Sequence, residues 1–463
     1  MTRPEPEDFL RDLPGDAPVG PVLQGQAPEF SKSGLLRSGV VVALLSGLGN
    51  LLNVVFHFSV ARLLKPDEYA LLNTIFAVNV IATIPLIAVQ ANLVRELSVL
   101  LGKGEADAAG AVLRSTFAIV LRFAIVVCFV MAVLAWPAIE VLNIERPLPI
   151  IAAALSILIA VPLPAAWGAL QASERFAALG WLQSMASSLK LVFGLGLAVA
   201  GFGASAITFG VVAASAVALL VALLVLRPLW SKAKAGIHLP ARRLIGRYTL
   251  AAAIGLAFST MLTQSDLIWS RGSLPPDAAG DYAAASVITG FILLLPVVVT
   301  TVLFPRIARL GDDPVGRQAL VLGLAVVAGL SAVLLALFAA CPTLLLHIAM
   351  GTQYDGAAPW LLPLGVAMTG YALATVYFNH FLAQGGKRYA VVLGIVFVVQ
   401  QVLFLRFHAS GWQIVWVQFG CGLALVFASE VFERQARFRI VRRRTRYPGV
   451  EGPASGSGPR SGE

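Results

Sequence analysis

Two ionisable side chains lie deep inside long apolar segments of this chain, where ligand binding is the chemistry to consider. Lys190 lies about 11 residues from either end of the apolar segment 178–200, and Asp266 lies within the segment 248–270. A lone ammonium at this depth costs about 2.5–3.5 kcal/mol on insertion scales unless it faces water, a counter-ion or an anionic ligand. The sequence therefore predicts that these groups bind a charged ligand or form a structural ion pair.

Polar side chains form a stripe on the segment 38–61, and a matching stripe recurs 213 residues later on the segment 248–270. Steps of four, three and four residues place the members of each stripe on one helical face. The first stripe consists of Ser46, Asn50, Asn53 and His57, and the second of Ser259, Thr263, Asp266 and Ser270. Interhelical hydrogen bonding would explain either stripe alone. Their recurrence favours the lining of a cleft between two similar halves.

The candidate substrate-binding residues are therefore polar groups at membrane depth. They are Lys190, Asp266, Asn50, Asn53, His57, Thr263, Ser270 and Arg122. For Arg122, near one end of its segment, an interfacial side chain that reaches for water is the competing interpretation. For His57, a structural imidazole competes with a proton relay. The sequence holds no Walker A loop, HExxH or GxSxG motif, so we expect no enzymatic activity and no cofactor or metal site.

The composition indicates a membrane protein. Hydrophobic residues make up 58% of the chain and charged residues 13%, whereas a soluble protein has about 25% charged residues. The net charge of +10 does not indicate nucleic-acid binding, because Lys and Arg cluster in alternate loops between apolar segments.

Twelve segments are long and apolar enough to cross a bilayer. They lie near 38–61, 70–94, 116–138, 148–170, 178–200, 204–227, 248–270, 281–305, 318–345, 357–382, 388–406 and 411–433. With a cytoplasmic N-terminus, 24 basic residues fall on the inner side and 5 on the outer side. This asymmetry predicts that both termini are cytoplasmic.

Two short motifs also recur at the offset of 213 residues and indicate a duplicated chain. Glu68-Tyr69-Ala70 returns as Asp281-Tyr282-Ala283, and Gln171-x-x-x-Arg175-Phe176-Ala177 returns as Gln384-x-x-x-Arg388-Tyr389-Ala390. Six crossings in each half make the repeat parallel. The predicted organisation is a disordered tail (1–33), a six-helix bundle (34–227), a basic cytoplasmic linker (228–247), a second bundle (248–434) and a basic, then disordered tail (435–463).

Several segments resemble one family, the polysaccharide transporters or Wzx-like oligosaccharide flippases of the multidrug/oligosaccharidyl-lipid/polysaccharide (MOP, MATE-like) exporter superfamily. The resemblance is carried by Ala61–Ala70 after the first crossing, by Leu170–Phe176 after the fourth, and by Asp266, Ala279–Ser286 and Leu303–Arg306 around the seventh and eighth. These matches are spread over residues 35–435.

The resemblance implies an all-α polytopic membrane protein with about twelve transmembrane helices in two parallel repeats around a central cleft. It implies a flippase that moves an undecaprenyl-pyrophosphate-linked oligosaccharide to the outer leaflet of a bacterial inner membrane, for lipopolysaccharide or other surface polysaccharide. Its partners would be the lipid-linked glycan, membrane lipids, a glycan polymerase, glycosyltransferases and a coupling ion, H⁺ or Na⁺, with no nucleic acid. Two alternatives stay open: a cation-coupled multidrug antiporter, with Asp266 as its ion site, and a non-transporting membrane partner of a glycan polymerase.

Overall fold

The structure is a computed structural model of the 463-residue chain, and it describes residues 32–135, 139, 147–231, 247–296, 314–383 and 389–446. Its described residues form helices and contain no strand. Eleven of the helical stretches are long and apolar enough to cross a membrane, and α1 (Lys32–Leu63) covers the first predicted crossing. The prediction of an all-α polytopic protein with about twelve crossings is confirmed.

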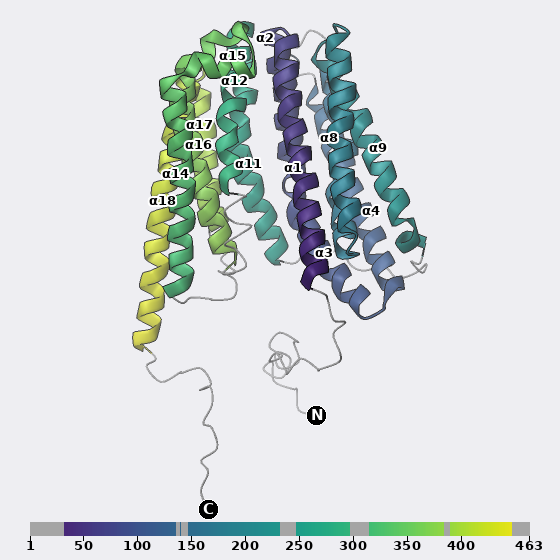
Figure 1. The fold of residues 1–463 in the computed structure, drawn as a ribbon. Coiled ribbons are helices and arrows are strands. Elements are labelled where there is room, and N and C mark those ends of the chain that lie inside the picture. Colours follow the sequence, from purple (N-terminus) through teal and green to yellow (C-terminus); the bar gives the residue numbers. More distant parts are fainter. Residues whose placement is uncertain are drawn as a thin grey trace, which may run out of the picture.

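The helices form two bundles that stand side by side (Figure 1). The first bundle contains α1, α2 (Pro66–Thr83), α3 (Leu86–Gly102), α4 (Ala106–Val133), α6 (Leu148–Ala160), α7 (Leu163–Ala172), α8 (Phe176–Val199) and α9 (Ala204–Ser231). The second contains α11 (Arg247–Ser273), α12 (Pro276–Thr289), η2 (Gly290–Leu294), α14 (Pro314–Ala340), α15 (Pro342–Ala349), η3 (Thr352–Ala357), α16 (Ala358–Ala383), α17 (Tyr389–Arg406) and α18 (Gly411–Arg446). Helix α1 begins and α18 ends at the same end of the molecule, as an even number of crossings requires.

Some predicted crossings consist of two helices rather than one. Helices α2 and α3 meet at Pro85, and α6 and α7 meet at Pro162. A proline removes a backbone donor and clashes with the preceding turn, so the helix breaks there. The crossings are also longer than the apolar count suggests: α2 and α3 together span Pro66–Gly102, because polar residues at both ends remain helical.

Some predictions fall on parts of the chain that the structure does not describe. They include both terminal tails outside residues 32–446, most of the basic linker 228–247 after Ser231, and the second copy of the Gln/Arg motif at 384–388. The crossing predicted at 281–305 is described as far as Pro296.

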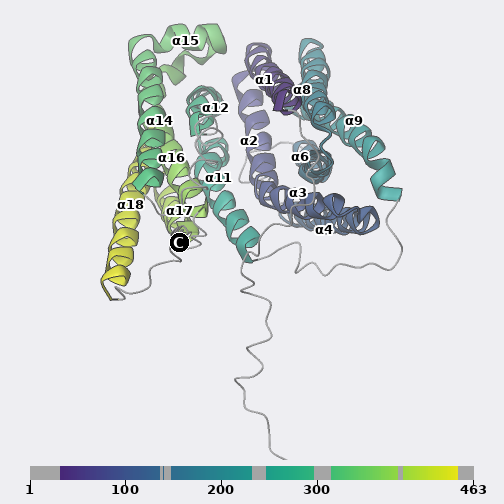
Figure 2. The same ribbon diagram turned by 60° about the horizontal axis from the view of Figure 1, so that its bottom comes forward.

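The bundles meet along α2, which packs against both α11 and α12. Within the first bundle, α8 packs along α1, and within the second, α17 packs along α11 (Figure 2). One apolar core cluster extends through both bundles and includes the fully buried Tyr69, Tyr282 and Tyr354.

Candidate functional site

Lys190 lies on α8 and points at α1 and α2. Its ammonium donates a hydrogen bond to Asn53 Oδ1 at 2.7 Å. It also lies over two aromatic faces, 4.3 Å from the ring centroid of Phe56 and 4.7 Å from that of Phe76. Within the described ranges, no carboxylate forms an ion pair with it. The ammonium is therefore held by an amide oxygen and by cation–π contacts, and its positive charge is not neutralised there.

Small residues bring α8 close enough to α1 for these contacts. A Cβ on Gly194 would lie 2.5 Å from Cε2 of Phe56, so glycine is what lets the phenyl ring pack against α8. Closer to the other end, Ser184 donates to the Leu45 carbonyl at 2.7 Å, and Gly180 faces the Leu45 side chain. Such small residues permit close helix approach within a membrane.

Of the other members of the first stripe, His57 lies against the two phenyl rings that contact Lys190, and Asn50 lies further along α1. His57 packs edge-on against Phe56 and Phe76, with ring centroids 5.4 and 5.6 Å apart, and its Nδ1 is buried without a hydrogen-bond partner in the described part of the chain. Asn50 is exposed one turn before Asn53, which is also exposed. We name this group the Lys190 site: Asn50, Asn53, Phe56, His57, Phe76 and Lys190. Ser46 belongs to the predicted stripe, but the structure does not describe its side chain.

The second stripe has a different environment, although it occupies equivalent positions. Asp266 corresponds to Asn53, is fully buried, and accepts a hydrogen bond from the Tyr282 hydroxyl at 2.8 Å. Ser270 is also buried and donates to the Leu267 carbonyl, while the half-buried Thr263 donates to Thr260. These bonds all lie inside the second bundle. Lys190 and Asp266 are not an ion pair, so the two predicted central charges have separate surroundings.

Arg122 lies apart from both groups. It is exposed on α4, among exposed apolar side chains such as Leu121, Ile125 and Val126. Helix α4 packs against α3, α6 and α9 rather than along α1. The structure therefore does not bring Arg122 into the Lys190 site.

A buried glutamine network in the second bundle is absent from the sequence-based candidates. The Gln400 amide donates to the Leu262 carbonyl at 2.9 Å and to Gln418 Oε1 at 2.8 Å, and Tyr371 donates to the same Gln418 oxygen at 2.6 Å. The network joins α11, α16, α17 and α18 beside Asp266. The signal in the sequence was the presence of Gln400 and Gln418 inside apolar segments, but an uncharged amide is a weaker signal than an ionised group.

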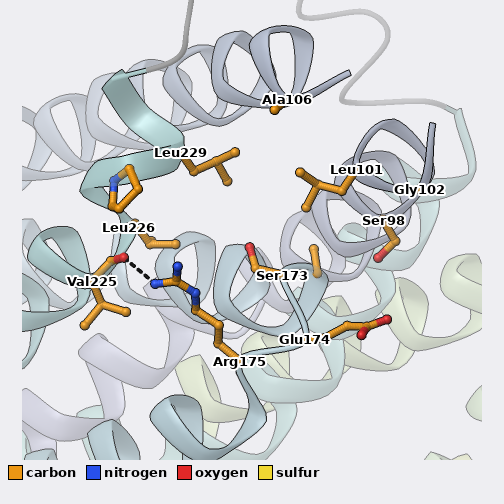
Figure 3. A pocket seen from close by; sticks show the side chains of 12 residues that line it. Ser98, Leu101, Gly102, Ala106, Ser173, Glu174, Arg175, Val225, Leu226 and Leu229 are labelled. Atoms are coloured by element: carbon orange, nitrogen blue, oxygen red, sulfur yellow. Dashed lines mark hydrogen bonds between the residues drawn. The ribbon is translucent and has the colours of Figure 1, made fainter. Parts of the chain in front are cut away.

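A pocket of about 480 Å³ opens at one end of the first bundle, lined by α3, the start of α4, the end of α7 with the turn that follows it, and α9 (Figure 3). Arg175, from the duplicated motif, lines it and donates to the Val225 carbonyl at 2.7 Å. Val225 lies three residues before Pro228, which is inside α9. At 1.5 Å per residue, Arg175 is about 22 Å along α8 from Lys190, so the pocket is separate from the Lys190 site.

Comparisons with known proteins identify the fold and the family. The family model for "Polysaccharide biosynthesis protein" matches residues 35–311. A multidrug resistance MATE family transporter of the MOP superfamily, in an inward-facing conformation, has a similar structure, with a TM-score of 0.65 at 13% identity over 87% of this chain and 98% of that chain. The lipid II flippase MurJ, in an inward closed conformation, also gives a TM-score of 0.65 at 13% identity, over 85% of this chain and 87% of its own. An outward-facing MATE transporter of the same superfamily gives 0.59 at 13% identity, over 86% and 95%. No curated protein matches the sequence.

Proposed function

The chain belongs to the family of polysaccharide biosynthesis proteins, and we propose that it is a flippase for a lipid-linked oligosaccharide. The substrate is a glycan on undecaprenyl pyrophosphate, which moves from the cytoplasmic to the outer leaflet of a bacterial inner membrane. The two bundles rock about the space between them, so that the site is open to one side at a time. The similarity to a protein described as a lipid II flippase supports this substrate class.

The observation that carries the proposal is the uncompensated charge of Lys190. An ammonium has three hydrogen-bond donors, and Asn53 accepts only one of them. The others can meet the pyrophosphate oxygens in charge-assisted bonds, and the anion supplies the missing counter-charge. Asn53 and, one turn earlier on α1, Asn50 are exposed, and their amides suit sugar hydroxyls. The lipid tail stays in the bilayer.

The membrane potential favours this direction of movement. With the inside negative, outward transfer of one negative charge is favourable by about 2.3 kcal/mol at 100 mV. A coupling ion, H⁺ or Na⁺, would add to this drive, and Asp266 is our candidate for its site because it is a buried carboxylate with a tyrosine partner.

The buried Asp266 also favours a second function, cation-coupled multidrug export, in which this carboxylate binds the ion or a cationic drug. Drug sensitivity of cells that lack the protein distinguishes the two. The further alternative, a non-transporting partner of a polymerase, is excluded if the purified protein alone moves the glycan lipid.

The test measures transport of a fluorescent polyprenyl-pyrophosphate oligosaccharide in proteoliposomes. We expect Lys190→Ala to abolish transport and Lys190→Arg to retain part of it, because arginine keeps the charge but changes its geometry. Lys103→Ala is the matched control, since Lys103 is an exposed lysine in the turn after α3. Full transport by Lys190→Ala, with parental thermal stability, would contradict the proposed site.

A further inference from the structure

Two helix ends at one end of the molecule are capped by residues of the opposite bundle. Helix α1 ends at Leu63, and the last carbonyls of a helix have no partner within it. Gln353 of η3, in the second bundle, donates through Nε2 to the Ala61 carbonyl at 2.6 Å and to the Leu64 carbonyl at 2.9 Å. The neighbouring Tyr354 hydroxyl also donates to Ala61, at 3.0 Å.

The capping is reciprocal. Arg62, at the end of α1, donates through Nη2 to the Ile348 carbonyl and, at 3.4 Å, to that of His347. Both carbonyls belong to the last turn of α15. A cation at a helix C-terminus interacts favourably with the helix dipole. Each bundle therefore completes a helix end of the other.

A tightly packed layer lies directly beneath these caps. The rings of Tyr69 and Tyr354 are 5.5 Å apart, and the Tyr69 hydroxyl contacts the sulfur of the fully buried Met350 at 3.7 Å. Pro66 and Gly280 touch so closely that a Cβ on Gly280 would lie 2.3 Å from Pro66 Cβ. The surfaces of the two bundles are thus complementary at this end.

The segment between α15 and η3 is shaped for this contact. Gly351 has a φ of +104°, a conformation that residues with side chains rarely adopt, and it turns the chain so that Gln353 lies over the end of α1. Its Cα faces Arg62, because a Cβ there would lie 3.6 Å from Arg62 Cγ. The turn at Gly351 therefore positions both Gln353 over the end of α1 and the end of α15 next to Arg62.

We propose that Pro342–Ala357, comprising α15 and η3, is a latch that holds the two bundles together at the outer end and must release before the site opens outward. The assignment of this end as the outer one rests on the proposed flippase function and its topology. In the latched state, the carbonyls of Ala61 and Leu64 and those of His347 and Ile348 accept hydrogen bonds from the opposite bundle. In the released state, water donates hydrogen bonds to them instead. The latch thereby sets the ratio of closed to open molecules at this end.

The test measures distances with pairs of spin labels on the full-length protein in nanodiscs, without substrate. The labels are placed at Leu63→Cys and Asp277→Cys, which are exposed on opposite bundles at this end, after the three native cysteines are replaced by serine. We expect Gln353→Ala and Arg62→Ala each to raise the ratio of long to short distances about tenfold, since each removes two cross-bundle bonds. Gln353→Glu should raise it further, because a carboxylate cannot donate and faces two carbonyls.

Thr352→Ala, an exposed position on η3, is the matched control and should keep the parental distances. Thermal melting of each variant establishes that it is folded, and Tyr354→Phe provides a milder change that removes only one hydroxyl. If the Gln353 and Arg62 variants keep the parental distance distribution, the segment is a static connection and the latch is refuted. Lys190→Ala should block transport while keeping the latched distances, so a failure of the proposed substrate is distinguishable from a failure of the latch.

Discussion

Substituting Asn53 by aspartate should inactivate the Lys190 site without removing its lysine. Asn53 Oδ1 lies 2.7 Å from the ammonium, so a carboxylate at this position becomes an internal counter-ion. The protein already has an aspartate, Asp266, at the equivalent position of the second half. The substitution replaces one heavy atom, the amide nitrogen, by oxygen and preserves the size of the side chain, which makes charge the variable under test.

The size of the effect follows from the distance. Two unit charges about 3 Å apart attract each other by roughly 5 kcal/mol at an effective dielectric constant of 20. Loss of hydration and side-chain entropy offset most of this attraction in a half-exposed pair. If about 1.4–3 kcal/mol remains as competition against the substrate anion, its apparent affinity falls about 10- to 150-fold.

Transport and binding in proteoliposomes measure this effect, with a fluorescent polyprenyl-pyrophosphate oligosaccharide as the probe. Asn53→Ala is the matched control, because it removes the amide without adding charge, and we expect a loss of only a few-fold. The exchange Asn53→Lys with Lys190→Asn keeps one cation and one amide in the same pair, and should recover part of the transport that Lys190→Asn alone loses.

Parental affinity and transport in Asn53→Asp would contradict the proposal that the positive charge of Lys190 binds the substrate. An equal loss in Asn53→Ala and Asn53→Asp would also contradict it, since the amide and not the charge would then matter. Thermal melting separates either result from misfolding.

Two further predictions concern packing and orientation. Gly194→Val should destabilise the protein by about 1–3 kcal/mol and lower its melting temperature, because a Cβ at this position would lie 2.5 Å from Phe56. Gly196→Ala should be tolerated, because no atom lies within 4 Å of a Cβ built there. Equal melting temperatures for the two variants would contradict the α1–α8 packing. In a background without native cysteines, a membrane-impermeant maleimide should label Asp277→Cys in intact cells and Lys103→Cys only after permeabilisation; the reverse pattern would invert the orientation of the bundles.

The crossings and the duplication could be predicted from the sequence, because both depend on local properties. Length and hydropathy select segments that can cross a bilayer, and a repeated motif such as Glu68-Tyr69-Ala70 needs only comparison along the chain. Lys190 was a candidate from the sequence alone, since a charge in the middle of an apolar segment is evident without knowledge of its neighbours. The breaks at Pro85 and Pro162 are local as well, because each proline removes a backbone donor at its own position.

What each polar side chain faces depends on how the helices pack and could not be predicted from the sequence. Asn53 and Asp266 are equivalent in the repeat, yet Asn53 meets Lys190 from α8, whereas Asp266 meets Tyr282 from α12. Helical periodicity places a residue on a face but does not say which helix packs there. The caps between Gln353 and Ala61 join residues 292 positions apart, because the carbonyls at a helix end bond to whatever donor packing brings to them.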